Sequence, residues 1–259
     1  KIMLRRVSQV FENKKINNIS EKIIQEFERI KFKEKIKPGM QIGITVGSRG
    51  IDNLELIIKT VIQEVKECGG SPCIIAAMGS HGGATVEGQL SILASYGITE
   101  EKMGVPVRAT DEVIELGKLA NGLLVYFNKI ANSLDGLIII NRIKVHTSFK
   151  SDIESGLCKM LAVGLGGHKG ASLVHSLGVK ALSEYMVKFS ECIIQKASIL
   201  CGIGSLNNSY DKTYKIISAN LEDFKKLDRI LLKECKRILP RLPVSDIDLL
   251  IIGQIGKNI

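Results

Sequence analysis

Residues 41–50, QIGITVGSRG, decide the fold that this chain is expected to adopt. The first six form a short apolar run typical of a buried strand, and Gly-Ser-Arg-Gly then breaks the run before a helix that begins at Asp52 or Asn53. The same order of strand, loop and helix follows at once in residues 73–96, with the loop at 78–85. Two consecutive units of this kind predict a parallel sheet with right-handed crossovers.

Further apolar runs extend the pattern. They lie at residues 105–109, 123–127 and 137–140, and later at 199–206 and 213–218. The run Leu-Ile-Ile-Ile at 137–140 shows no alternation with polar residues, which is typical of a strand buried on both faces. We predict an α/β fold with a doubly wound, mostly parallel, Rossmann-like sheet, in which ligands bind at the carboxyl ends of the strands.

Amphipathic helices are expected beside these strands. Ser20 is the predicted N-cap of the first helix, residues 179–196 form a long one, and residues 221–239 form the last. Residues 2–11 are expected to add a strand at the start of the chain.

A second domain is predicted to begin near the end of the sequence. Pro-Arg-Leu-Pro at 240–243 resembles a linker, residues 248–252 are expected to form a new buried strand, and a new loop follows at 253–257. We therefore assign residues 1–243 to an N-terminal α/β domain that binds cofactor and substrate. Residues 244–259 are interpreted as the first strand and loop of a truncated C-terminal domain, which makes the chain a fragment.

The composition excludes several classes of protein. With 45% apolar and 24% charged residues and no apolar run of membrane-spanning length, the chain is expected to be soluble. The net charge of +9 favours anionic ligands, but the lysines are scattered and aromatics make up only 5%, so no nucleic-acid partner is predicted. Six cysteines without Cys-x-x-Cys spacing indicate reduced thiols and a cytoplasmic protein. The sequence leaves open whether homo-oligomers form.

Two histidines follow predicted strands in positions suited to chemistry. His81 lies in the glycine-rich loop 78–85, where an imidazole suits proton transfer near neutral pH. The same loop could instead be a phosphate-binding turn in which the histidine is incidental. His146 lies close to Arg142 and Lys144, which places a base beside a cluster able to hold an anion; an ordinary charged surface is the alternative interpretation.

A lysine and two more histidines lie downstream. Lys159 is surrounded by apolar and small residues, so it either reaches solvent at a helix end or is an amine of lowered pKa that can act as a nucleophile. The glycine-rich run 164–170 matches neither a Walker motif nor a dinucleotide-binding fingerprint. His168 and His175 show no zinc-binding spacing, but one histidine with ligands supplied by a cofactor would suit nickel or copper.

Together these loops resemble the nickel-dependent lactate racemase family, and the resemblance covers essentially the whole chain. The residues that match the family's arginine, two histidines, lysine and third histidine are Arg49, His81, His146, Lys159 and His175. A glutamine and a lysine that hold substrate in the family are matched by Gln254 and Lys257.

The resemblance implies a role for each residue. His81 and His146 would be the catalytic acid and base, and Arg49 would bind the substrate carboxylate. Lys159 would carry the nickel-pincer nucleotide, a pyridinium-3-thioamide-5-thiocarboxylic acid mononucleotide, through a thioamide bond, and His175 would be a metal ligand to its nickel. The glutamine and lysine near the end of the chain would orient the substrate.

The activity implied is that of an isomerase, a racemase or epimerase of a lactate-like 2-hydroxy acid. Hydride would pass from the substrate α-carbon to the cofactor while one histidine removes the hydroxyl proton. A non-catalytic protein of the same lineage that binds an anion or nucleotide is the alternative, and a zinc hydrolase is a third. The chain departs from the family in lacking a carboxylate at residues 43–46 and in having Leu157-Cys158 before the lysine, so the identity of the 2-hydroxy acid stays open.

Overall fold

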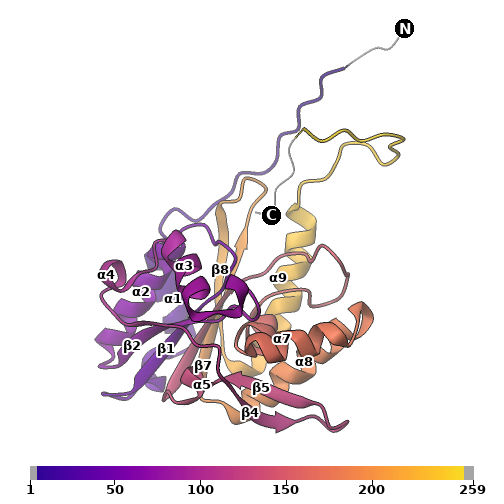
Figure 1. Cartoon of the computed structure of the whole chain (residues 1–259). Coiled ribbons are helices and arrows are strands. Elements are labelled where there is room, and N and C mark those ends of the chain that lie inside the picture. Colours follow the sequence, from indigo (N-terminus) through magenta and orange to yellow (C-terminus); the bar gives the residue numbers. More distant parts are fainter. Residues whose placement is uncertain (1–4, 254–259) are drawn as a thin grey trace.

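The computed structural model describes residues 5–253, apart from the side chains of residues 179–181 and 183. In this part of the chain the centre is a six-stranded sheet with the strand order β3-β2-β1-β6-β7-β8 (Figure 1). Every neighbouring pair is parallel except β7 and β8. The strands are β1 (Gln41–Val46), β2 (Ser71–Ala76), β3 (Val107–Arg108), β6 (Gly136–Arg142), β7 (Ile199–Asn207) and β8 (Thr213–Ala219).

The chain winds away from β1 in both directions. It first passes through the helix α2 (Leu54–Glu67) to β2 on one side of β1, and later returns to place β6 on the other side. Ligands of doubly wound proteins bind where the strand order reverses, just beyond the carboxyl ends of the strands. The ends of β1, β2 and β6 are therefore the expected position of a site.

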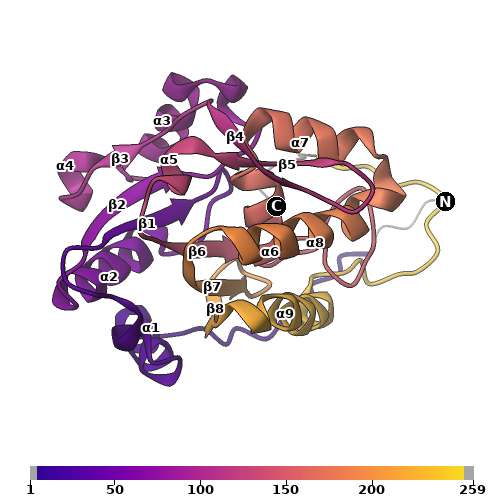
Figure 2. The ribbon, with the colours of Figure 1, turned by 90° about the horizontal axis from the view of Figure 1, so that it is seen from below.

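The sheet is buried on both faces. Along β6, Leu137 and Ile139 face one apolar core, whereas Ile138 and Ile140 face the other. This confirms the prediction that the Leu-Ile-Ile-Ile run is a fully buried strand, and it confirms the doubly wound α/β fold. Helices α1 and α2 contribute to one core and α7, α8 and α9 to the other, and Figure 2 separates the two groups into its left and right halves. The longer helices are α1 (Ile19–Arg29), α2, α3 (Val86–Ser95), α7 (Gly167–Ser176), α8 (Val179–Lys196) and α9 (Phe224–Ile238).

Short helical segments complete the chain. They are α4 (Glu100–Met103), α5 (Lys129–Asn132), α6 (Leu157–Lys159), a π-helical turn at Met160–Gly164, and 3-10 turns at Phe32–Lys35, Gly82–Ala84 and Leu221–Asp223. The predicted last helix at 221–239 is thus a 3-10 turn followed by α9. Among the described residues, no helix has both the length and the apolarity that crossing a membrane requires. All six cysteines are free thiols, as expected.

The apolar run at 123–127 does not join the main sheet. It forms β5 (Leu124–Asn128), which pairs antiparallel with β4 (Val113–Lys118), a strand that the sequence did not predict. The residues of β4 are exposed or only partly buried, so the strand lacks a strong apolar pattern. The buried side chains Val125 and Phe127 instead fasten this small sheet to the core that contains α7 and α8.

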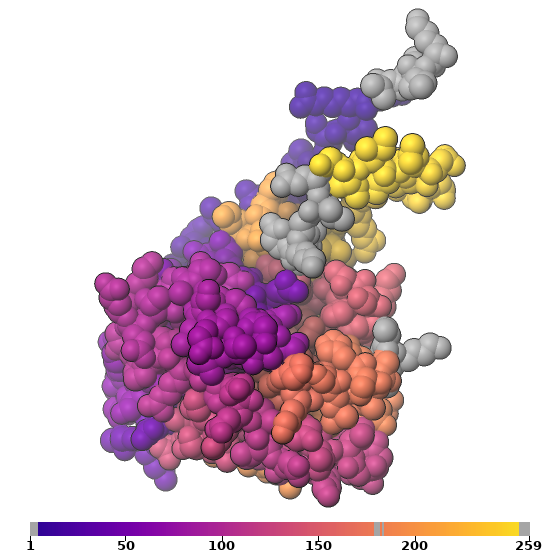
Figure 3. All heavy atoms as spheres, viewed as in Figure 1, coloured from indigo at the N-terminus to yellow at the C-terminus, as the bar shows by residue number. Residues whose placement is uncertain are grey.

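Three local predictions are wrong. The N-cap of α1 is Asn18, whose side chain accepts the Glu21 N–H, whereas the Ser20 hydroxyl lies 2.8 Å from the Thr60 hydroxyl. Residues 5–11 form no strand, and neither do residues 248–252, in which Ile251 is 84% exposed. Among the described residues, neither terminal segment pairs with a strand, and the Phe11 N–H donates instead to the Tyr210 hydroxyl at 3.2 Å. Both project from the body of the molecule in Figure 1 and Figure 3.

The second domain is not settled by this structure. The boundary at residue 243 stays a prediction, and Gln254 and Lys257 lie outside the described residues.

Candidate functional site

Three predicted site residues lie on loops at the carboxyl ends of adjacent strands. Arg49 follows β1, His81 follows β2 and His146 follows β6. Because β1 lies between β2 and β6, the three loops share one rim of the sheet. Lys159, at the end of α6, and His175, in α7, lie on either side of Gly164, whose carbonyl oxygen accepts the Gly79 N–H of the His81 loop at 3.0 Å.

Electrostatic effects connect these residues. The cationic groups of Arg49, Lys159 and His175 all lower the pKa of His81, after the larger effect of partial burial of the ring. The pKa of His146 is lowered by burial and then chiefly by Lys159, with His175 also contributing. All five predicted residues within the described part of the chain are therefore brought together. His168, which the sequence also singled out, is exposed on α7.

Lys159 is a base whose pKa is strongly lowered. Burial lowers its pKa to about 8, and the nearby charges of Lys144 and Arg49 add to this effect. Lowering the pKa of an amine increases the fraction of the neutral, nucleophilic form at physiological pH. Of the two interpretations of this lysine, the structure favours the amine of lowered pKa.

The buried carboxylate of Asp228 holds the segment that carries Lys159. It accepts hydrogen bonds of 2.9 Å from the backbone N–H groups of Leu157 and Cys158, the first residues of α6. Burial raises the pKa of Asp228 to about 7. Gly156 has a φ of 111°, and a Cβ there would overlap the carboxylate. Because Asp228 is far away in the sequence, no local pattern pointed to it.

His81 lies on an open, glycine-rich loop. Its Nδ1 is hydrogen-bonded to the hydroxyl of Ser48, and the residue keeps substantial contact with solvent although its ring is partly buried. Gly82 has a φ of 67°, and a Cβ on it would lie 2.6 Å from the carbonyl carbon of Gly88, so only glycine fits this turn. The loop is then tied to α3 by Thr85, whose hydroxyl accepts the Gly88 N–H at 3.1 Å.

His146 lies in a more enclosed loop. Its Nδ1 accepts the Ser148 N–H at 3.1 Å, and its ring packs on Phe149 with 4.3 Å between the ring centroids. Burial, together with the charges of Lys159 and Lys144, lowers the pKa of His146 to about 4, and the attraction of Glu154 opposes this only in part. The imidazole is therefore neutral across the physiological range.

A buried carboxylate fastens this second loop. Glu154 is only 1% exposed; it accepts the backbone N–H groups of His146 at 2.8 Å and Ser151 at 2.9 Å, and forms an ion pair of 2.6 Å with Lys236. The sequence did not single out Glu154. The available signal was an acidic residue between Ile153 and the small and apolar residues that follow.

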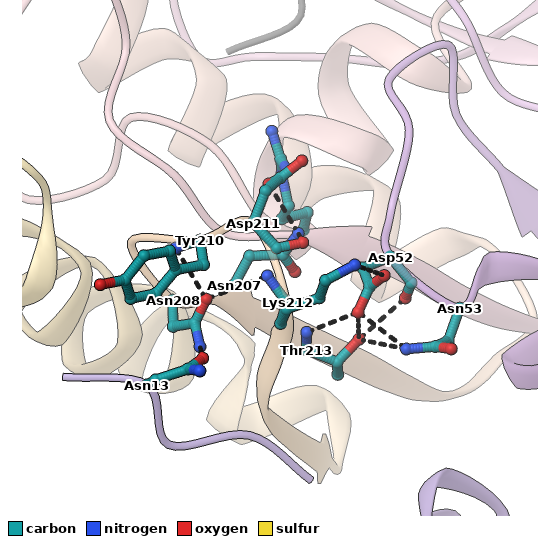
Figure 4. A network of polar contacts seen from close by, with 10 residues as sticks. Asn13, Asp52, Asn53, Asn207, Asn208, Tyr210, Asp211, Lys212 and Thr213 are labelled. Atoms are coloured by element: carbon teal, nitrogen blue, oxygen red, sulfur yellow. Dashed lines mark hydrogen bonds and ion pairs between the residues drawn. The ribbon is translucent and has the colours of Figure 1, made fainter. Parts of the chain in front are cut away.

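The loop that carries Arg49 is anchored to the β7–β8 hairpin (Figure 4). Asp52 accepts the Thr213 N–H at 2.7 Å, and the Thr213 hydroxyl is 2.9 Å from the Asp52 carbonyl oxygen. Asn53 donates to the same hydroxyl at 3.1 Å. The side chain of Arg49 itself is exposed, so the hairpin fixes the backbone of the loop and leaves the guanidinium accessible.

The described residues contain no group of three or more His, Cys, Asp or Glu side chains that could hold a metal ion. A metal bound through His175 would therefore need further ligands from another source.

These features define a class of protein: a doubly wound α/β domain with two histidines, an arginine and a lysine of lowered pKa gathered at the switch point of its sheet. The chain belongs to the lactate racemase N-terminal domain family, whose model matches residues 2–181. The match includes Arg49, His81, His146, Lys159 and His175.

One solved structure supports the fold. The chain is similar to the lactate racemase apoprotein from Thermoanaerobacterium thermosaccharolyticum, with a TM-score of 0.57 and 13% sequence identity. The similarity covers 83% of this chain and 55% of that chain, so this chain corresponds to little more than half of that protein. No curated protein matches the sequence significantly.

Proposed function

We propose that the protein is a racemase or epimerase of a 2-hydroxy acid that works with a nickel-pincer nucleotide. The observation that carries this proposal is the position of Lys159. This amine of lowered pKa lies close enough to His81 and His146 to lower the pKa of both. A cofactor attached to Lys159 would therefore reach the two groups best suited to proton transfer.

The residues present fit such a cofactor. With a pKa of about 8, roughly a tenth of the Lys159 amine is neutral at pH 7, which is sufficient for it to form a covalent bond slowly or with the help of another enzyme. His175 is exposed on α7, and imidazole is a suitable ligand for nickel. Because the described residues contain no group of three or more side chains that could hold a metal ion, further ligands would come from the cofactor. When bound, the cofactor supplies the acceptor for the substrate hydride.

The protein's own residues would bind the substrate and move its proton. The Arg49 guanidinium would bind the carboxylate, since its planar fork matches two carboxylate oxygens. His81 and His146, whose pKa values are both lowered, are available as neutral imidazoles beside the hydroxyl group of the bound acid. Small 2-hydroxy acids carry both groups on adjacent carbons, which is why this class of substrate fits the rim.

Intact mass spectrometry tests the attachment. The full-length protein would be co-expressed with the cofactor pathway, beside Lys159→Ala and the control Lys169→Ala, a change at an exposed lysine of α7. We expect the added cofactor mass in the wild type and the control and none in Lys159→Ala. Retention of that mass in Lys159→Ala would refute the assignment of this lysine.

Chiral chromatography tests the reaction. Cofactor-loaded protein should interconvert the enantiomers of at least one 2-hydroxy acid. If loaded protein racemises none of a panel of mono- and dicarboxylic 2-hydroxy acids but is stabilised against heat by them, the alternative function of a non-catalytic anion-binding protein would replace this proposal.

A further inference from the structure

Ser48 is held in place between the two loops at the centre of the rim. It lies in the loop after β1, separated from that strand by Gly47; its hydroxyl is hydrogen-bonded to Nδ1 of His81, and its carbonyl oxygen accepts the Tyr96 hydroxyl at 2.8 Å. Tyr96 is the C-cap residue of α3, the helix that follows the His81 loop. The hydroxyl of Ser48 is thus presented to His81 by a backbone fastened at a second point.

The contact with Ser48 leaves Nε2 as the ring nitrogen of His81 that can exchange a proton with a substrate. A hydroxyl can either donate to Nδ1 or accept from it. If Ser48 donated, the neutral ring would carry its proton on Nε2 and could not take up another there. If Ser48 accepts, Nδ1 carries the proton and Nε2 has a free lone pair. The second arrangement also suits the protonated ring, because Nδ1 keeps its acceptor when Nε2 gains a proton.

The hydrogen-bond partner of Nδ1 in His146 is a donor only, unlike the Ser48 hydroxyl beside His81. Its Nδ1 accepts the backbone N–H of Ser148, a donor that cannot become an acceptor. The neutral ring must therefore carry its proton on Nε2. A second proton on Nδ1 would face the Ser148 N–H directly, so His146 is built to remain neutral and to donate a hydrogen bond from Nε2.

We propose that Ser48 is the positioning residue that holds His81 in the Nδ1–H form and so leaves its Nε2 free to accept the hydroxyl proton of the substrate enantiomer that presents its hydroxyl group to His81. This proposal rests on the proposed function for the identity of the substrate. The hydroxyl proton of that enantiomer passes to Nε2 of His81 as its carbonyl group forms, and His81 returns a proton when the same enantiomer is formed again.

Nuclear magnetic resonance can test the positioning without cofactor or turnover. Long-range proton–nitrogen correlation spectra of the full chain, labelled with 15N-histidine, distinguish protonated from unprotonated ring nitrogens. Comparison with His81→Gln assigns the His81 signals. We expect wild-type His81 to be mainly in the Nδ1–H form at neutral pH.

Two variants and one control define the role of the hydroxyl. In Ser48→Ala, His81 should become a mixture of tautomers, and its titration midpoint should fall because the imidazolium loses an acceptor. Ser48→Thr, which keeps the hydroxyl, should restore the wild-type spectrum, and Ser80→Ala, a change at the exposed serine next to His81, should leave it unaltered. A wild-type ring in the Nε2–H form, or a Ser48→Ala spectrum equal to that of the wild type, would overturn the proposal.

Kinetics of the loaded full-length protein supply a second measurement. Ser48→Ala should lower kcat about 10-fold with little change in KM, because the substrate still binds but fewer molecules present the correct tautomer. If the enzyme is active and Ser48→Ala leaves kcat unchanged, the proposed role of Ser48 is refuted, whereas the proposed function is not. If no 2-hydroxy acid is racemised, the proposed function fails, and the spectra still decide whether Ser48 positions His81.

Discussion

The His81 loop and the His146 loop present the same side chain at the same rim and differ in how they hold it. The His81 loop is exposed and rich in glycine, and its histidine is held by a hydroxyl from another loop. The His146 loop is organised around the buried carboxylate of Glu154, and its histidine is held by a backbone N–H and packs on Phe149. The comparison teaches that the partner of Nδ1, rather than the presence of a histidine, determines what each ring can do.

The largest expected effect on activity is that of replacing each histidine, and it tests whether the two histidines differ. His81→Gln should lower kcat/KM about 10³-fold because a proton acceptor is lost. His146→Gln should lower it only about 10- to 100-fold, because the glutamine amide can still donate a hydrogen bond to the oxygen. Racemisation rates of cofactor-loaded full-length protein provide the measurement. Equal losses would restore a symmetrical acid/base pair.

The difference in how the loops are fastened should appear in stability. Glu154→Gln breaks an ion pair whose carboxylate is buried and removes charge from two hydrogen bonds, so we expect a loss of about 2 kcal/mol in the free energy of unfolding. The estimate is at the low end because Lys236 is 39% exposed. In the His81 loop, Thr85→Ala removes a helix cap and should cost about 1 kcal/mol. Urea unfolding measures both, and a larger cost for Thr85→Ala would reverse the ranking.

Titration of the two rings sharpens the comparison further. His146 should titrate at about pH 4, and His81 at a pH below the ordinary value of 6.5. Lys159→Met should raise both midpoints, because the lysine charge lowers the pKa of each ring. Nitrogen chemical shifts of the imidazoles report these midpoints. A rise in only one of them would show that Lys159 is close to a single histidine.

The lowered pKa of His146 also affects stability. Between pH 4 and 6.5 the unfolded chain binds more protons at this residue than the folded chain does. The contribution of His146 to stability is therefore complete above pH 6.5 and decreases as the pH falls through this window.

Asp228 should show an effect of the opposite sign. Its pKa rises from 3.8 to about 7 on folding, so the folded chain binds more protons between these values. Its contribution to stability is present below pH 3.8 and is lost as the pH rises towards 7. Asp228→Asn should remove this dependence while changing the free energy of unfolding at pH 7 by only about 1 kcal/mol, because the lost hydrogen bond is offset by the relief of a buried charge. Denaturant unfolding from pH 5 to pH 8 measures both, and an unchanged slope would contradict the assignment.

Much of the sheet could be predicted because each of its buried strands is a continuous run of apolar residues in the sequence. The apolar runs of β1, β2 and β6 are long enough and buried enough to be recognised without their neighbours. The strand β4 escaped prediction because it is half-exposed, and the run at 248–252 was wrongly predicted because apolar residues form a strand only where another strand pairs with them.

The sequence by itself determined the doubly wound fold and the presence of Arg49, His81 and His146 in loops after successive strands, because the period of apolar residues and the glycine-rich breaks are local signals. Only the tertiary structure decided what distinguishes the two histidines. Ser48 and His81 belong to different loops, and the residues that fasten the other segments are distant in sequence or buried by folding. Hydrogen bonds and burial between such segments set pKa values and tautomers, and they exist only after the strands have been placed side by side.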